Sequence, residues 1–165
     1  MFRSITFVLS IWFLSGCSEP LSDSLATCRS EIWAQSSTEL AYACIIRFDN
    51  QILLRKIDGK YGLLHHNGSD ICAAHQGLFE ATGWNAKLIS IGQLIPSNTQ
   101  LITCSLDNVI DANRFPRQTL TGDDLILIDP FTLTHKDFHQ PDDLIGIKNT
   151  FLHTPSSKSL HIAPN

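Results

Sequence analysis

Three acidic side chains are the first candidates for chemistry in this sequence: Glu80, Asp123 and Asp124. Carboxylate oxygens bind hard divalent cations such as Mg²⁺, and a bound cation can activate a water molecule as a nucleophile. A single exposed carboxylate, however, binds Mg²⁺ weakly. Chemistry with Mg²⁺ at Glu80 would therefore require Asp123 or Asp124 to join it in the folded chain.

Histidines lie near Glu80 in the sequence, with His65 and His66 adjacent to each other and His75 farther along. Neutral imidazoles suit Zn²⁺ or Cu²⁺ better than Mg²⁺, so a site built from these residues and Glu80 would bind a different metal. Adjacent histidines are also common as solvated residues, and Glu80 can be an ordinary solvated residue. The sequence leaves these alternatives open.

A helix over about Asp70 to Thr82 is expected to carry Glu80. Ser69 can cap the start of this helix, and Gly83 stands where a helix commonly ends in left-handed geometry. Because an α-helix has 3.6 residues per turn, positions 77, 80 and 81 share one face. What Glu80 can do therefore depends on its neighbours at positions 77 and 81.

Apolar and alternating runs predict strands on both sides of this helix. The expected strands cover 41–48, 51–57, 61–64, 87–94, 100–106 and 125–128. Asp49-Asn50 and Asp58-Gly59 are typical turn pairs, so the first two strands should form a hairpin. Residues 65–68 and 108–117 are expected to be loops, and a second helix is expected between Asp143 and Phe151.

The spacing from Gly62 to Trp84 resembles the signature of the Nudix hydrolase family. Gly62 takes the opening Gly position, Leu78 the aliphatic position, Glu80 the first Glu of a Glu-Glu pair, and Gly83 the closing Gly. The run Gly59-Lys60-Tyr61-Gly62-Leu63 also resembles the family's Gly-Lys-Trp-x-Leu. The resemblance implies an α+β protein, a Nudix-type α/β/α sandwich. Its mixed β-sheet would be flanked by the Nudix helix (about Asp70 to Thr82) and a C-terminal helix.

Four positions depart from that signature. Gln76 replaces its Arg, while Gly77, Ala81 and Gly68 replace Glu residues. In an active member the carboxylates bind Mg²⁺, which bridges the diphosphate of the substrate and activates water. The resemblance therefore implies a degraded catalytic box in which Glu80 is a remnant. Gly77 should also cost about 1 kcal/mol relative to Ala in a helix interior, which the sequence does not explain.

The first sixteen residues, 1–16, have the features of a bacterial signal peptide. A single cation, Arg3, precedes an apolar run from Ile5 to Leu14 that is too short to remain as a membrane span. The end of the run, Leu14-Ser15-Gly16-Cys17, resembles a lipobox, which implies cleavage before Cys17 and acylation of that cysteine. Ser18 then favours the outer membrane, with the protein facing the periplasm.

The other four cysteines are Cys28, Cys44, Cys72 and Cys104. An even number in an oxidising compartment predicts two disulfides, with four buried free thiols as the alternative. Proximity in the sequence favours Cys28 with Cys44 and Cys72 with Cys104, although all three possible pairings remain open.

Composition limits the partners of the chain. The formal net charge is −4, and removal of the leader with Arg3 makes it about −5. The basic residues Arg47, Arg55, Lys56 and Lys60 are scattered around one hairpin, so nucleic-acid binding is not expected. We predict a tether over 17–38, one Nudix-like domain over 39–155 and a polar tail over 156–165.

These observations predict a lipid-anchored envelope protein whose Nudix-like domain is a non-catalytic binding or structural module. Its partners would be the membrane, through the lipid on Cys17, and an unidentified protein or small molecule. One alternative is a residual pyrophosphohydrolase that acts on a nucleoside diphosphate derivative with Mg²⁺. The other is a histidine-based metal-binding lipoprotein. No cofactor is expected unless hydrolase activity remains.

Overall fold

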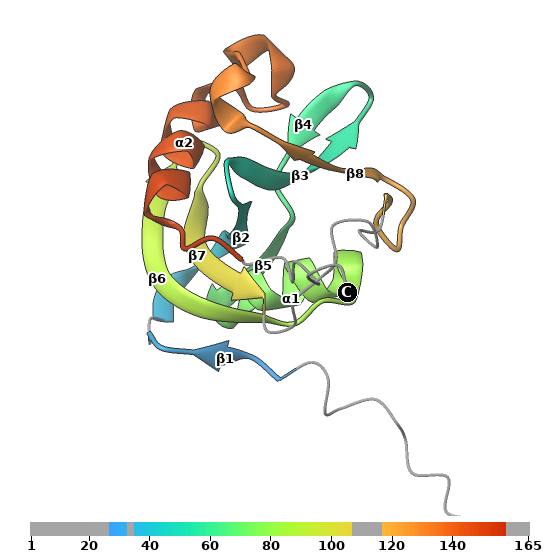
Figure 1. The fold of residues 1–165 in the computed structure, drawn as a ribbon. Coiled ribbons are helices and arrows are strands. Elements are labelled where there is room, and N and C mark those ends of the chain that lie inside the picture. The colour runs from blue at the N-terminus through green and yellow to red at the C-terminus, as the bar shows by residue number, and fades with distance from the viewer. Residues whose placement is uncertain (1–26, 33–34, 107–116, 158–165) are drawn as a thin grey trace, which may run out of the picture.

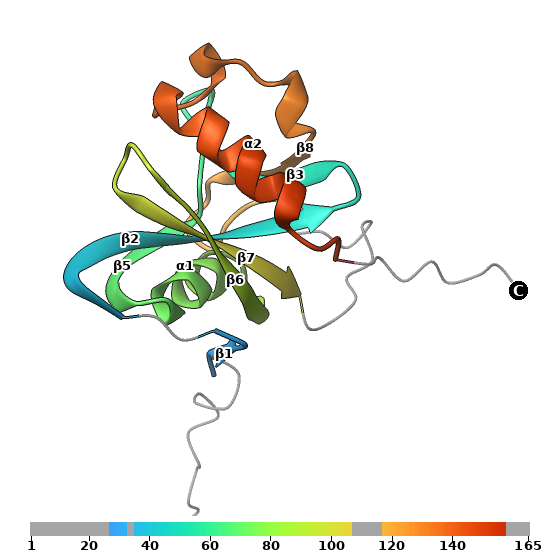
Figure 2. The same cartoon turned by 90° about the vertical axis from the view of Figure 1, so that its left-hand side faces the viewer.

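A computed structural model describes residues 27–32, 35–106 and 117–157 of the chain. These residues form a mixed β-sheet with one α-helix on each face (Figures 1 and 2). The helices are α1 (Cys72–Thr82) and α2 (Leu144–His153). The strands are β1 (Arg29–Ser30), β2 (Gln35–Phe48), β3 (Gln51–Ile57), β4 (Lys60–Gly62), β5 (His65–Asp70), β6 (Ala86–Ile95), β7 (Thr99–Leu106) and β8 (Asp124–Ile128).

The strand order along the sheet is β1-β6-β7-β2-β3-β4, with β5 paired to β2 and β8 paired to β3. The β1–β6 and β2–β7 pairs are parallel, and the other pairs are antiparallel. This arrangement confirms the predicted α+β sandwich with a mixed sheet and a C-terminal helix.

Strand β2 shows why the sequence forms two separate cores. Its alternate residues Tyr42, Cys44 and Ile46 belong to the cluster beneath α1. Ala43 and Ile45 belong to the cluster that includes Ile147 of α2. Because successive side chains of a strand point to opposite faces, a fully apolar strand of this kind packs against a helix on both sides.

The predicted turns and the predicted end of α1 are confirmed. Asp49, Asp58 and Gly59 all have positive φ, the conformation that a tight turn between strands requires. Gly83 has φ of 74°, and its N–H donates to the carbonyl of Phe79 over 2.7 Å. Glycine takes this left-handed conformation without the steric cost that a Cβ would bring.

Both predicted disulfides form, but the favoured pairing is wrong. The bonds join Cys28 to Cys72 and Cys44 to Cys104. Cys44 and Cys104 lie on β2 and β7, which are parallel neighbours even though β3 to β6 separate them in the sequence. Proximity in the sequence fails here because the crossover connection, and not the intervening length, decides which cysteines meet.

Residues 65–68 are not the predicted loop, because they belong to β5 and pair with β2. This strand continues to Asp70, so α1 begins at Cys72 and Ser69 does not cap it. The carboxylate of Asp70 instead accepts a hydrogen bond from the N–H of Cys72 over 2.8 Å. Three 3₁₀ turns that the sequence did not predict, η2 (Pro130–Thr132), η3 (His135–Asp137) and η4 (Pro141–Asp143), lead into α2.

Regular structure begins before the expected domain boundary at residue 39, because β1, β2 and the Cys28–Cys72 bond all involve earlier residues. The predicted signal peptide, 1–16, and Cys17 lie outside the described residues, as does most of the predicted 108–117 loop. Within the described part of the chain, no helix is both long and apolar enough to cross a membrane.

Candidate functional site

Glu80 lies on the exposed face of α1, and its carboxylate is engaged by two neighbours. The amide of Gln76 donates to one oxygen over 2.7 Å, and Nδ1 of His66 lies 3.1 Å from the other. The side chains of His66 and Glu80 are 35% and 53% exposed. An exposed pair of this kind contributes little to stability, and its oxygens already have partners without a metal.

Gly77 lies where α1 packs directly against the backbone of β5. A Cβ at this position would lie 2.8 Å from the carbonyl carbon of His65 and 2.9 Å from the backbone nitrogen of His66. No side chain fits that gap unless β5 moves. This contact explains a glycine that costs helix propensity, because the close approach of helix and strand requires the absence of a Cβ.

Ala81 is partly buried, and its backbone contacts another segment of the chain. Its carbonyl accepts a hydrogen bond from the N–H of Leu120 over 2.7 Å, which brings the turn before β8 against the end of α1. Gly122 in that turn has φ of 99°. The turn before β8 is therefore bonded to the backbone of the third position of the predicted catalytic face.

The two later candidate carboxylates have other partners. One oxygen of Asp123 lies 3.8 Å from Nη1 of Arg55, and Asp124 accepts a hydrogen bond from Gln118 over 3.5 Å. His66 and Glu80 are thus the pair that the structure brings together from the predicted set. In the described residues, no group of three or more His, Cys, Asp or Glu side chains could hold a metal ion.

The other two histidines differ sharply in environment. His75 is 2% exposed, lies within hydrogen-bonding distance of the Asn85 side chain at 3.0 Å, and stacks on Phe79. His65 instead lines a cleft. Partial burial lowers the pKa of His65 below its ordinary 6.5, although a hydrogen bond to the Leu63 carbonyl works in the other direction.

A cleft of about 450 Å³ opens between the β3–β5 strands and the segment that leads into α2. We call it the Arg55 cleft. Its polar lining includes charged, amide, hydroxyl and imidazole groups, and its apolar lining is partly aromatic. The residues that carry the argument below are Arg55, Tyr61, Leu63, His65, Phe138 and Asp143.

Arg55 is the most unusual residue of this cleft. Its Nε is buried and has no hydrogen-bond partner among the described residues. Its Nη1 lies near Asp123, in a pair whose side chains are about one-third exposed (30% and 29%). A buried donor without an acceptor costs about 1–3 kcal/mol, so the folded chain holds this N–H at a cost.

Several contacts fix the remaining walls of the cleft. The N–H of His139 donates to the Tyr61 carbonyl over 3.0 Å, and the Tyr61 and Phe138 rings lie 6.2 Å apart. Asp143, which is 5% exposed, accepts a hydrogen bond from the N–H of Ser97 over 3.0 Å. These contacts join β4, the β6–β7 turn and the start of α2 around one cavity.

Comparison with known proteins gives structural matches alone. No protein-family model matches the chain. No curated protein matches it in sequence. Among solved structures, a Nudix hydrolase from Nitrosomonas europaea matches with a TM-score of 0.52 and 14% identity, over 76% of this chain and 78% of that one.

Two further structures agree with this match. An ADP-ribose pyrophosphatase from Streptococcus suis 89-1591 gives a TM-score of 0.54 and 13% identity, over 73% of this chain and 95% of that one. A UDP-X diphosphatase gives 0.51 and 16%, over 75% and 68%. The chain has the Nudix hydrolase fold. At these identities the matches establish the fold, and the site residues must be argued from this chain.

In this Nudix fold, α1 occupies the expected place of the Nudix helix, over Cys72–Thr82. Leu78 is fully buried in the core beneath α1. Gly68, at the early Glu position of the resemblance, also faces a tight contact, because a Cβ there would lie 2.7 Å from the Cβ of Ala73. Close packing therefore leaves no room for a side chain at position 68 or at position 77.

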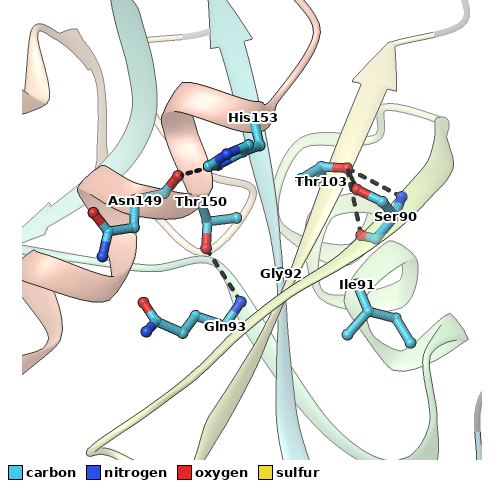
Figure 3. Close-up of a pocket in the computed structure, with 8 residues that line it drawn as sticks. All are labelled: Ser90, Ile91, Gly92, Gln93, Thr103, Asn149, Thr150 and His153. Atoms are coloured by element: carbon cyan, nitrogen blue, oxygen red, sulfur yellow. Dashed lines mark hydrogen bonds between the residues drawn. The ribbon is translucent and has the colours of Figure 1, made fainter.

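A second, more open groove of about 390 Å³ lies between β6 and α2 (Figure 3). Its polar groups largely satisfy one another. The Ser90 and Thr103 hydroxyls lie 2.6 Å apart, and Thr150 accepts from the N–H of Gln93. His153 bonds to the carbonyl of Asn149. These four side chains therefore have partners within the described part of the chain.

Sequence reasoning missed the Arg55 cleft, since it treated Arg55 as one of four scattered cations. One signal was available: Arg55 directly follows the apolar run Ile52-Leu53-Leu54 within the expected strand 51–57. A charged residue at such a position is rarely buried without a reason. Its unpaired Nε, however, depends on chain segments far apart in the sequence.

Proposed function

We propose that this chain is a lipid-anchored envelope protein in which the Nudix fold serves as a non-catalytic binding module, with the Arg55 cleft as its binding site. The observation that carries the proposal is the closure of position 77 by the β5 backbone, 2.8 Å from where a Cβ would stand. A catalytic carboxylate cannot occupy this position while β5 keeps its place.

Electrostatics supports the loss of hydrolysis. The α1 face retains one carboxylate, Glu80, which is bonded to Gln76 and His66. Mg²⁺ needs several oxygen ligands in a near-octahedral arrangement, and one carboxylate provides a poor site. Without the metal, the negative charge of Glu80 would repel the diphosphate of a substrate.

The proposed location rests on the leader, 1–16, and on Cys17. It is supported by the two disulfides, because such bonds persist in oxidising compartments such as the bacterial periplasm. A lipid on Cys17 would hold the domain at a membrane, which we propose to be the outer membrane, with the cleft exposed to the periplasm.

The test of lost catalysis is an assay of the purified chain, with its disulfides intact, against ADP-ribose, a UDP-sugar and a nucleoside triphosphate. Mg²⁺ and Mn²⁺ are supplied separately. We expect no release of phosphate or nucleoside monophosphate above a no-protein control. Metal-dependent turnover that is lost in Glu80→Gln would overturn the proposal.

The contact between His66 and Glu80 favours one second candidate, a residual pyrophosphohydrolase. This candidate requires a metal, so its turnover should disappear with a chelator and should fall in both His66→Gln and Glu80→Gln. His153→Gln is a suitable control, because this histidine lies on α2 and takes no part in the predicted site. Equal turnover in all three variants would exclude the candidate.

The anchor is tested separately from the domain. The wild-type chain and Cys17→Ser are expressed in cells that are fed labelled palmitate, and membrane and soluble fractions are then compared. We expect the label and the membrane association in the wild type alone. Labelling of the Cys17→Ser chain would show that this cysteine is not the lipidation site.

A further inference from the structure

The two disulfides of the chain are interleaved along the sequence. The bonds join Cys28 to Cys72 and Cys44 to Cys104, so each closed loop contains one cysteine of the other bond. Neither bond joins cysteines that are neighbours in this order. A pairing of this kind raises the question of how the chain avoids bonds between the nearer partners.

Loop closure in the unfolded chain favours a different bond. The entropic cost of closing a loop rises with its length, and Cys28 and Cys44 span the shortest of the possible loops. On this basis Cys28 meets Cys44 about fivefold more often than it meets Cys72. The same scaling makes this contact about sevenfold more frequent than that of Cys44 with Cys104. Rapid oxidation of the unfolded chain therefore favours the Cys28–Cys44 bond and leaves Cys72 to pair with Cys104.

Oxidation after folding does not supply the native Cys44–Cys104 bond. Cys44 and Cys104 are 4% and 0% exposed, and both belong to the core beneath α1. Thiol–disulfide exchange requires that the attacking group reach the sulfur, so an oxidant has no access to this pair in the folded chain. The buried bond must therefore form while the core is still open, and in that state loop closure favours the wrong pair.

The Cys28–Cys72 bond has the opposite environment. Both residues are partly exposed, and they line a surface pocket of about 350 Å³ with Gln76 and Glu80 of α1. Cys72 is the first residue of α1, and Cys28 directly precedes β1 at the edge of the sheet (Figure 1). A second molecule can therefore reach this bond after the core beneath α1 has closed. The structure thus favours an order in which the buried bond forms first and the exposed bond forms last.

We propose that this chain is a substrate of a disulfide isomerase, a dithiol protein that converts the Cys28–Cys44 and Cys72–Cys104 bonds into the native pair. The inference rests on the proposed location in the envelope, because disulfides form in an oxidising compartment. Export led by residues 1–16 would also bring Cys28 and Cys44 into that compartment before the other two cysteines. The isomerase acts while the chain folds, so it is a partner distinct from any ligand of the folded domain.

Three exchange steps complete the conversion, and each step breaks one S–S bond and forms another. A thiolate of the isomerase attacks Sγ of Cys28, which gives a mixed disulfide and releases Cys44 as a thiolate. The pairing of β2 with β7 then brings Cys44 to Cys104, and its attack releases Cys72 as a thiolate. Cys72 finally attacks Cys28 in the mixed disulfide and releases the isomerase thiolate. No net oxidation or reduction occurs, and the last step takes place at the pair that stays accessible.

The experiment follows disulfide pairing in the full chain with Cys17→Ser, which removes the fifth thiol. Trypsin separates the other four cysteines onto different peptides, because Arg29, Arg47 and Lys87 lie between them. The reduced, unfolded chain is diluted into native buffer with diamide, which oxidises thiols and leaves none free for exchange. After diamide is removed, one portion receives buffer and the other a catalytic amount of reduced protein disulfide isomerase. Acid stops each reaction at timed intervals, and mass spectrometry measures the linked peptides.

We expect the Cys28–Cys44 peptide pair to exceed each native pair by about threefold or more after diamide alone. The isomerase should then produce the native pairs at least about tenfold faster than buffer does. The control variant, Cys28→Ala with Cys72→Ala, leaves Cys44 and Cys104 without competitors. Their bond should therefore form under diamide alone, and the peptide readout does not require that this variant folds.

Two results would overturn the proposal. One is a majority of the native pairs after diamide alone, which would show that folding selects the partners without help. The other is a Cys28–Cys44 bond that the isomerase leaves in place. The proposed location fails separately, through a wild-type chain that takes up no labelled palmitate, and the refolding measurement does not depend on that result.

Discussion

The α1 surface and the Arg55 cleft are the two regions of this molecule that carry candidate functional groups, and their polar groups are in opposite states. On α1, Glu80 has two bonded neighbours and Gly77 is closed by the backbone of β5. In the cleft, whose volume is about 450 Å³, Arg55 keeps a buried donor without an acceptor among the described residues. The polar groups of α1 are satisfied by their neighbours, whereas the buried donor of Arg55 costs stability.

Under the proposed function, this difference separates catalysis from binding within one fold. Close packing fills the space beside position 77 of α1, and a cavity remains on another part of the sheet. Function then follows from the side chains of the cavity and not from the fold alone. Four changes would break or sharpen this comparison.

The largest effect is expected from removal of the Cys44–Cys104 bond. Cys44→Ala together with Cys104→Ala should lower the free energy of unfolding by about 4 kcal/mol from loop closure, with a further loss because both sulfurs lie in the core beneath α1. Urea unfolding measures this change. The matched control is the double variant at Cys28 and Cys72. It removes a bond that closes a loop of similar length at a less buried position.

That second variant should therefore cost less than the first, although loop closure alone predicts a difference of only about 0.3 kcal/mol between the two. Equal losses in the two double variants would show that burial of the sulfurs adds nothing. The α1 core would then depend on its cysteines less than the contacts suggest.

The next effect is expected from Gly77→Glu, which restores a carboxylate of the family signature. The new side chain must displace β5, so we expect a loss of about 3 kcal/mol in urea unfolding and no Mg²⁺-dependent hydrolysis. Gly77→Ala is the matched control for the Cβ alone and should lose about 1–3 kcal/mol in spite of its better helix propensity. A stable, hydrolytically active Gly77→Glu chain would break the comparison.

A smaller effect is expected from His65, whose backbone blocks Gly77 and whose ring lines the Arg55 cleft. Because its pKa is lowered in the folded chain, the unfolded chain takes up the proton first as the pH falls below 6.5. The stability contribution of the neutral ring is thus fully present above that pH. It declines as the pH falls through the interval between the ordinary and the lowered pKa.

Urea unfolding between about pH 8 and pH 5 measures this slope, and the difference between wild type and His65→Gln isolates one group. We expect the free energy of unfolding of His65→Gln to fall less than that of the wild type as the pH is lowered. His135→Gln is a control, since His135 lies on the exposed turn η3 outside the cleft. An unchanged slope in His65→Gln would mean that its ring is not desolvated.

The smallest effect is expected from Glu80→Gln. The exposed contacts of Glu80 with His66 and Gln76 should be worth within about 0.5 kcal/mol, so unfolding should hardly change. A loss of more than about 1 kcal/mol would show that the α1 surface depends on this carboxylate more than its exposure implies.

Most of the sheet could be predicted from the sequence because its signals are local. The expected hairpin at 41–57 is confirmed as β2 and β3, and the expected strands at 87–94 and 100–106 are confirmed within β6 and β7. Apolar runs of this kind have a turn at each end, so neighbouring residues are enough to identify them. The helix between Asp143 and Phe151 is confirmed as α2 for the same reason.

Strand β5 could not be predicted in this way. Its residues, His65-His66-Asn67-Gly68-Ser69-Asp70, have low β propensity and match a polar loop. They form a strand because their backbone pairs with β2, which supplies hydrogen bonds that no local pattern announces. The disulfide pairing failed for a related reason, since parallel neighbours in a sheet are distant in the sequence.

The amino-acid sequence was sufficient for the α+β class, for the turns at Asp49 and Asp58, for the end of α1 at Gly83 and for Glu80 as the carboxylate of that helix. These features depend on residue type and on spacing within a few residues. The tertiary structure decided which cysteines meet, why Gly77 is required and that Arg55 has a buried donor in a cleft. These depend on contacts between distant segments, whose free energy exists only once the chain is folded.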